Sequence, residues 1–147
     1  MKKFIFTLVL CLLSAVAGAV AADKVENPQS CRQCGMDRDF FAHSRMLIAY
    51  ADGTTVGECS INCAAIEMKQ NAGRQVKSIM VGDYITKKLI DARKAIWVVG
   101  GRKSGVMTSE AKWAFAGKDA AEKFVKEYGG RITSFDEALD LAIKEND

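Results

Sequence analysis

Proline and histidine are nearly absent from the sequence, with one residue of each among its 147 residues. A single proline and 12 glycines do not make a low-complexity chain, and 49% hydrophobic with 27% charged residues is an ordinary globular composition. A single histidine excludes a catalytic zinc site with three histidine ligands. The sequence also lacks a glycine loop ending in Gly-Lys-Ser or Gly-Lys-Thr, which would bind phosphate, and the nucleophile elbow of serine hydrolases.

Net charge is also small, at +3 from 21 Lys and Arg and 18 Asp and Glu. Lys2 and Lys3 lie in a segment that we predict to be removed, which leaves the remainder almost neutral. We therefore expect neither nucleic acid nor an anionic membrane surface to be the main partner.

Residues 1–22 have the pattern of an export signal. A basic start precedes an apolar run over 4–16, and small residues lead to a predicted cleavage near Ala21, before Ala22 or Asp23. The apolar run is shorter than a helix needs to cross a bilayer, so we expect no membrane-spanning segment once the signal is removed. The alternative is an uncleaved N-terminal anchor.

The first cysteine, Cys11, does not make a convincing lipoprotein signal, because Leu10 precedes it where a small residue is required. We therefore expect an exported protein, in a bacterial periplasm, where disulfides can form.

The rest of the chain predicts one domain. A polar segment at 23–30 is expected to be a flexible leader, and the domain over 31–147 contains two similar rounds, at about 31–75 and 93–147. Each round predicts a hairpin, a helix and a glycine stop.

In the first round, a strand over 46–50 is followed by Asp52-Gly53, a strong hairpin signal, and by a return strand that begins at Thr54. A helical face then follows, with Gly73 as its expected end; its apolar residues are Ile61, Ala64, Ala65 and Met68.

In the second round, strands are predicted over 95–99 and 112–116, and Asp119 is the expected N-cap of a helix that Gly129-Gly130 ends. A last helix is predicted from Ser134, with Glu137 completing a capping box. Strands that need helices on one face to bury them indicate an α+β domain of two hairpin-plus-helix (ββα-type) repeats that share a core.

Four cysteines follow the predicted signal, in two closely spaced pairs. Cys31 and Cys34 stand in Cys-Arg-Gln-Cys-Gly-Met ahead of the first hairpin, and Cys59 and Cys63 stand where that hairpin leads into its helix. Residues four apart on a helix share a face, so both thiols of the second pair can point the same way. We expect all four thiols to come within reach of one ion.

Three interpretations of these cysteines are open: a tetrahedral structural zinc site, disulfide pairing, and a copper(I) site. Met36 favours copper(I), because it lies two residues after Cys34 and a thioether binds copper(I) better than it binds zinc. Met107 lies in a polar, glycine-rich loop and is either a further ligand or a loop anchor. The methionines on apolar faces are assigned to the core; they are Met46, Met68 and Met80.

The single histidine, His43, is either a structural residue or a ligand or proton-linked neighbour of the cysteines. Cys-x-x-Cys is also a redox motif, but the sequence predicts no helix beginning at Cys34 that would lower the pKa of its thiol. An oxidoreductase is therefore not favoured.

The order of short motifs from about Cys34 to Leu139 resembles the NosL family, which are exported copper(I) chaperones associated with the maturation of nitrous oxide reductase. The first of these motifs is Cys34-Gly35-Met36, followed by His43. Two more have distinctive sequences, Asp-Tyr-Ile-Thr at 83–86 and Gly-Val-Met at 105–107. The remaining short matches lie at 90–92, 95–100, 114–116, 120–121 and 129–130. The resemblance implies a pair of small αβ repeats, in a fold shared with organomercurial lyases.

It also implies that Cys34 and Met36 hold copper(I), with Met107 as a further candidate. Delivery would be through an ABC-type maturation transporter to nitrous oxide reductase or a similar copper enzyme, so we expect a carrier and not an enzyme.

Two features depart from the NosL pattern. NosL proteins are commonly lipoproteins, whereas this chain is expected to be soluble or anchored in another way. Cys31, Cys59 and Cys63 lie outside the minimal Cys-x-Met motif. Together, Cys34, Cys59 and Cys63 resemble the cysteine pattern of TRASH, a small metal-sensing treble clef. We therefore predict a periplasmic copper(I) metallochaperone of NosL type. The alternatives are a zinc-binding or disulfide-stapled, treble-clef-like interaction module and a protein that handles mercury thiolates.

Overall fold

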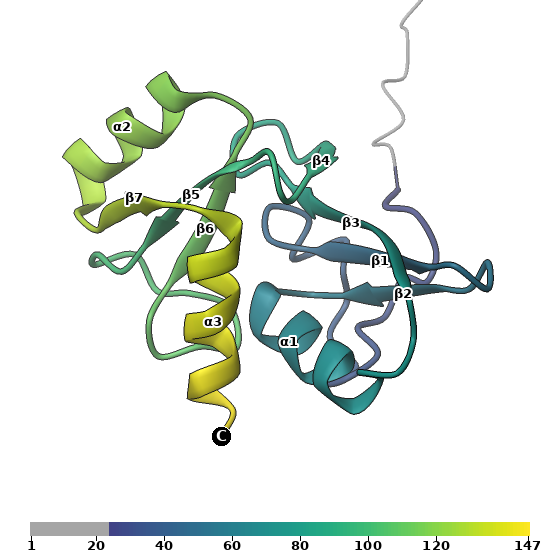
Figure 1. Cartoon of the computed structure of the whole chain (residues 1–147). Helices are drawn as coiled ribbons and strands as arrows, with labels where there is room; N and C mark the ends of the chain where they lie inside the picture. Colours follow the sequence, from purple (N-terminus) through teal and green to yellow (C-terminus); the bar gives the residue numbers. More distant parts are fainter. Residues whose placement is uncertain (1–23) are drawn as a thin grey trace, which may run out of the picture.

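The computed structural model describes residues 24–147, which form two small units of the same connectivity (Figure 1). The first unit contains β1 (Met46–Tyr50), β2 (Thr55–Glu58), α1 (Ile61–Gln70), β3 (Val76–Gly82) and β4 (Leu89–Asp91). The second unit contains β5 (Ile96–Val99), β6 (Lys112–Phe115), α2 (Lys118–Tyr128) and β7 (Arg131–Thr133), and α3 (Phe135–Glu145) follows it. This confirms the predicted α+β class.

Both sheets are antiparallel, with strand orders β2-β1-β3-β4 and β6-β5-β7. In each unit the first strand is central, the second pairs on one side, and the strand after the helix pairs on the other. The repeat is therefore ββαβ, one strand longer than the ββα repeat that the sequence predicts. The Asp52-Gly53 turn joins β1 to β2 as expected, and Gly53 has a φ of 88°, which few other residues adopt.

Two predicted helix ends are wrong. The first helix ends before Gly73, because Asn71 caps it and its N–H donates to Glu67 O. The N-cap of α2 is Gly117 and not Asp119, which lies in the first turn, where its carboxylate favours the helix dipole. Ser134 is the N-cap of α3 as predicted, and its side chain accepts a hydrogen bond from the Glu137 N–H, but the Glu137 carboxylate contacts Thr133 and Arg131 and so does not complete the capping box.

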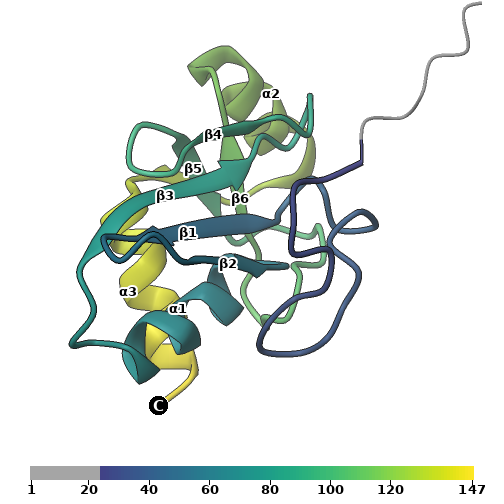
Figure 2. The same ribbon diagram turned by 90° about the vertical axis from the view of Figure 1, so that its right-hand side faces the viewer.

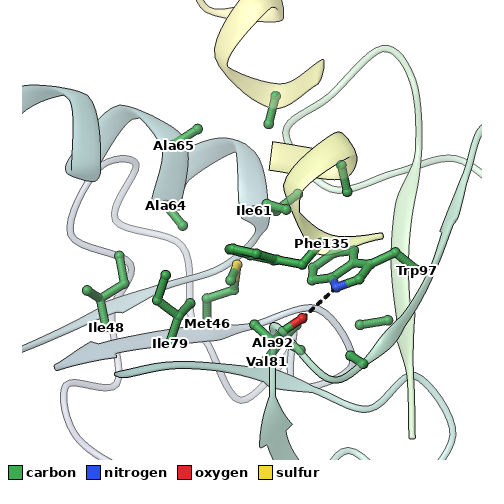
Figure 3. Close-up of a cluster of buried hydrophobic side chains, with 14 of the residues drawn as sticks. Met46, Ile48, Ile61, Ala64, Ala65, Ile79, Val81, Ala92, Trp97 and Phe135 are labelled. Carbon is green, nitrogen blue, oxygen red and sulfur yellow. Dashed lines mark hydrogen bonds between the residues drawn. The ribbon is translucent and has the colours of Figure 1, made fainter. Parts of the chain in front are cut away.

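The main core lies between the first sheet and the helices α1 and α3, which pack side by side although they are far apart in the sequence (Figures 1 and 2). Figure 3 shows Trp97 of β5 and Phe135 of α3 entering this core, with ring centroids 5.9 Å apart. The Trp97 indole N–H donates to Ala92 O at 2.9 Å, so its polar atom is satisfied (Figure 3). Residues of the second unit and of α3 therefore complete the core of the first.

Two residues of the leader expected at 23–30 contact the domain, while the other described residues of that segment are exposed. Val25 is buried and its N–H donates to Asp39 Oδ1 at 2.8 Å. Glu26 pairs with Arg38 and, at 2.9 Å, with Arg45. Two buried guanidinium groups thus hold this segment, which the polar composition did not reveal.

The predicted export signal at 1–22 lies outside the described residues. Within residues 24–147, no helix has the length and apolar character needed to cross a membrane.

Candidate metal centre

The first cysteine pair is held in a tight turn that precedes β1. The Cys31 N–H donates to Met36 O at 2.8 Å, and the Gly35 N–H donates to Cys31 O at 2.9 Å. Gly35 has a φ of 76°, a backbone conformation that glycine adopts without steric strain. The turn reverses the chain and brings both thiols of Cys-x-x-Cys to one place.

The second pair flanks the start of α1. Cys59 directly follows β2, and its carbonyl accepts a hydrogen bond of 2.8 Å from Ser44 Oγ. Ser60 is the N-cap, and its Oγ accepts from the Cys63 N–H at 3.4 Å. Both thiols of the second pair thus lie at the N-terminal end of α1.

The four thiols form one group, as the sequence predicts. The sulfur atoms of Cys31, Cys34, Cys59 and Cys63 all lie within 4.8 Å of one another. Cys34 Sγ is 3.5 Å from Cys59 Sγ, which is 3.7 Å from Cys63 Sγ. A metal–sulfur bond of about 2.3 Å requires sulfur atoms about 3.8 Å apart in a tetrahedral site. The donor set therefore fits one thiophilic ion, and all four described cysteines are free thiols.

Access to this group is from one side. Cys34 is partly exposed, whereas Cys31, Cys59 and Cys63 are each at most 3% exposed. The buried thiols belong to a second apolar cluster that includes Trp113, Phe115 and Phe124 of the second unit. An ion would therefore lie against an apolar wall and exchange past Cys34.

The other predicted ligands are Met36, Met107 and His43. Met36 is partly buried and packs against the same cluster, while Met107 is 49% exposed in the loop between β5 and β6. His43 packs against aromatic rings, with centroids 5.4 Å from Trp113 and 5.9 Å from Tyr84. Burial lowers the pKa of His43, with nearby Lys87 and Lys103 acting in the same direction, so its imidazole is neutral at pH 7.

Comparison with known proteins agrees with this arrangement. The NosL family model matches residues 22–141, most of the chain. The chain belongs to the NosL family. The crystal structure of the copper chaperone NosL from Shewanella denitrificans matches with a TM-score of 0.62 and 25% sequence identity, over 80% of this chain and 94% of the other. No curated protein matches the chain. The resemblance noted in the sequence and the expected fold are therefore confirmed.

In this NosL chain, a buried carboxyl group borders the thiols. Glu58, at the end of β2, is fully buried, and a contact of 2.8 Å joins its Oε2 to Cys31 Sγ. Burial raises the pKa of Glu58 to about 9, and the contact with Cys31 acts in the same direction. No sequence pattern identifies this residue, because a glutamate at a strand end is usually exposed.

The pKa values of three of the thiols shift in opposite directions because the thiols lie so close together. Hydrogen bonds from Cys59 and Cys63 lower the pKa of Cys31, and the same hydrogen bonds raise the pKa values of the two donors. The Cys31 thiol donates to Glu58 Oε2 at 2.8 Å, and the directions of these shifts favour ionisation of Cys31 before that of Cys59 or Cys63.

Proposed function

We propose that this protein is a periplasmic copper(I) metallochaperone that binds the ion through its cysteine group and transfers it without chemical turnover. The observation that carries the proposal is the group of four free thiols within 4.8 Å of one another. Membership of the NosL family and the likeness to a copper chaperone support copper as the cargo.

The ligand set combines thiolate and thioether sulfur, which are soft donors that suit copper(I). Cys34 is the central ligand, because it is the partly exposed thiol and lies 3.5 Å from Cys59 Sγ. In this proposal Met36, from the same turn as Cys34, and Met107, from the loop between β5 and β6, supply the thioether sulfur. A carrier needs ligands that hold the ion and still exchange it, and a half-buried thiol meets both needs.

The acceptor in this proposal is nitrous oxide reductase or a similar copper enzyme, reached through an ABC-type maturation transporter. This step rests on the family of the chain, and the export pattern at 1–22 supports a periplasmic location.

Copper(I) competition tests the proposal. The reduced, anaerobic protein is titrated against a chromophoric copper(I) chelator, and we expect Cys34→Ser to weaken binding by more than about tenfold, because even indirect partners of a metal ligand have effects of that size. Met36→Leu is expected to weaken binding as well, whereas the volume-matched control Met80→Leu, in β3, leaves it unchanged. Copper(I) affinity that is unaffected by Cys34→Ser contradicts the proposal.

A structural zinc site is a second candidate function, and one observation favours it. The sulfur separations of 3.5 and 3.7 Å are close to the edge of a tetrahedral zinc–thiolate site. Metal exchange separates the two candidates: zinc that copper(I) cannot displace from the anaerobically purified protein supports the zinc-binding module and contradicts the chaperone.

A further inference from the structure

One carboxylate joins the Met107 loop to the start of the cysteine-bearing helix. We propose that Glu145, the last residue of α3, is a positioning residue that fixes the Met107 loop against α1 and so keeps Met107 available to the copper(I) site. This inference rests on the proposed function and adds a residue that neither the motifs nor the cysteine group includes.

Both oxygens of Glu145 accept hydrogen bonds from the loop. Thr108 Oγ1 donates to Oε2 at 2.6 Å, and Ser109 donates to Oε1 from its hydroxyl, at 2.7 Å, and from its N–H. Thr108 and Ser109 directly follow Met107. The carboxylate thus holds the backbone on the C-terminal side of the thioether.

The same carboxylate also contacts the cysteine-bearing helix. Asn62 Nδ2 donates to Glu145 Oε2 at 2.9 Å, and Asn62 directly precedes Cys63 in the first turn of α1. Thr108 and Asn62 therefore share one acceptor atom, which places the loop next to the turn that carries Cys63. Val106 and Ala111 of this loop lie in the same buried cluster as Cys59 and Cys63.

A buried lysine completes the contact. Lys112 Nζ donates to Glu145 Oε2, Thr108 Oγ1 and Glu110 O, each at 2.9 Å, and its side chain is 1% exposed. A carboxylate at a helix C-terminus is unfavourable for the helix dipole, so the helix itself gains nothing from Glu145. The position of Glu145 is explained instead by its contacts with the loop, α1 and Lys112.

The conformation of Met107 shows why its loop needs this support. Met107 has a φ of 54°, which is strained for a residue with a side chain, and it is 49% exposed. A strained and exposed residue relaxes unless its surroundings fix it, and the described contacts of Thr108 and Ser109 with Glu145 do so.

The test compares copper(I) binding with zinc binding in variants of the full protein. Glu145→Gln keeps the size of the side chain, but an amide accepts on one atom only, so either the loop contact through Ser109 or the contact through Asn62 and Lys112 is lost. We expect copper(I) affinity to fall about tenfold, the effect typical of a residue that orients a ligand, and zinc affinity, which needs only the four thiols, to stay unchanged. Glu137→Gln is the matched control in α3, because Glu137 pairs with Arg131 on the surface.

A double-mutant cycle with Met107→Leu supplies the decisive readout. If Glu145 acts through Met107, the double variant binds copper(I) no more weakly than Met107→Leu alone. Additive losses, an equal loss of zinc affinity, or unchanged copper(I) affinity in Glu145→Gln would each overturn the inference. Should Glu145→Gln not fold, Thr108→Val removes one of the three hydrogen bonds from the loop to Glu145 and is expected to give a smaller loss that is again selective for copper(I). Copper(I) and zinc affinities equal to those of wild type would overturn the inference.

The result also separates this inference from the proposed function. If Cys34→Ser loses copper(I) but Glu145→Gln retains it, the inference fails and the chaperone stands. If Cys34→Ser retains copper(I), the proposed function fails, and the inference fails with it.

Discussion

A single methyl group at Gly57 is expected to disrupt the arginine that ties the cysteine turn to the first sheet. Gly57 lies in β2 opposite Leu47 of β1. A Cβ atom there would lie 2.5 Å from both Cζ and Nη1 of Arg38 and 2.8 Å from its Nε. Since van der Waals contact needs about 3.5 Å or more, the guanidinium group would have to move by about 1 Å.

That movement breaks a buried network. Arg38 is fully buried, and it donates to Glu26 O and Met46 O at 2.9 Å, to Glu58 O at 3.3 Å, and to the Glu26 carboxylate. Hydrogen bonds to charged groups contribute about 1.5–3 kcal/mol each, and disrupting a buried ion pair typically removes about 3–5 kcal/mol. Losing two of these bonds predicts that Gly57→Ala lowers the free energy of unfolding by about 3 kcal/mol or more.

Denaturant unfolding of the metal-free, reduced protein measures this change. Gly73→Ala is the matched control, because a Cβ there meets no atom within 4 Å, and it is expected to leave stability unchanged or to raise it by about 0.4–1 kcal/mol. Equal unfolding midpoints for Gly57→Ala and wild type would refute the reasoning, because the guanidinium would then have room to move without loss of its partners.

Two further predictions concern the thiols and acid pH. Because Cys34 is the one described thiol that is partly exposed, we expect a bulky alkylating reagent to modify it first in the metal-free, native protein; mass spectrometry of digested samples checks this, and equal labelling of all four cysteines contradicts it. The pKa of Glu145 is lowered, since hydrogen bonds from Thr108, Asn62 and Lys112 outweigh the opposing effect of burial. Its folded pKa therefore lies below the unfolded value of about 4.3, so its stabilising contribution is complete at neutral pH and is lost as the pH falls below about 4. We expect the unfolding midpoint to fall less between neutral and acid pH in Glu145→Gln than in wild type, and identical pH profiles would count against this assignment.

The fold was predictable where local signals agree with the final structure. Asp52-Gly53 favours a tight turn whatever surrounds it, and Ser134 caps α3 through a hydrogen bond from the nearby Glu137 N–H. The strand β3 was missed, because Lys77 and Ser78 interrupt its apolar pattern and both are exposed. Its place in the sheet depends on pairing with β1, which no local pattern contains.

Part of the candidate site could also be predicted from the sequence, and part could not. Cysteine has few roles, so the grouping of the four thiols followed from spacing, and the structure agrees. Glu58 and Glu145 could not be identified from the sequence, because a glutamate is usually a surface residue. Only tertiary contacts bury Glu58 and surround Glu145 with hydrogen-bond donors. The roles of Met36, Met107 and His43 remain predictions.

The position of α3 has a consequence for the order of assembly. This helix follows every other described element in the sequence, yet Phe135, Ala138 and Ala142 are buried in the core of the first unit. A nascent chain that has emerged only through β4 already carries all four cysteines but still exposes the apolar surface that α3 will cover. The thiol group is thus translated early and becomes part of a closed structure late, so premature capture of an ion by an incomplete chain is a hazard that this topology creates.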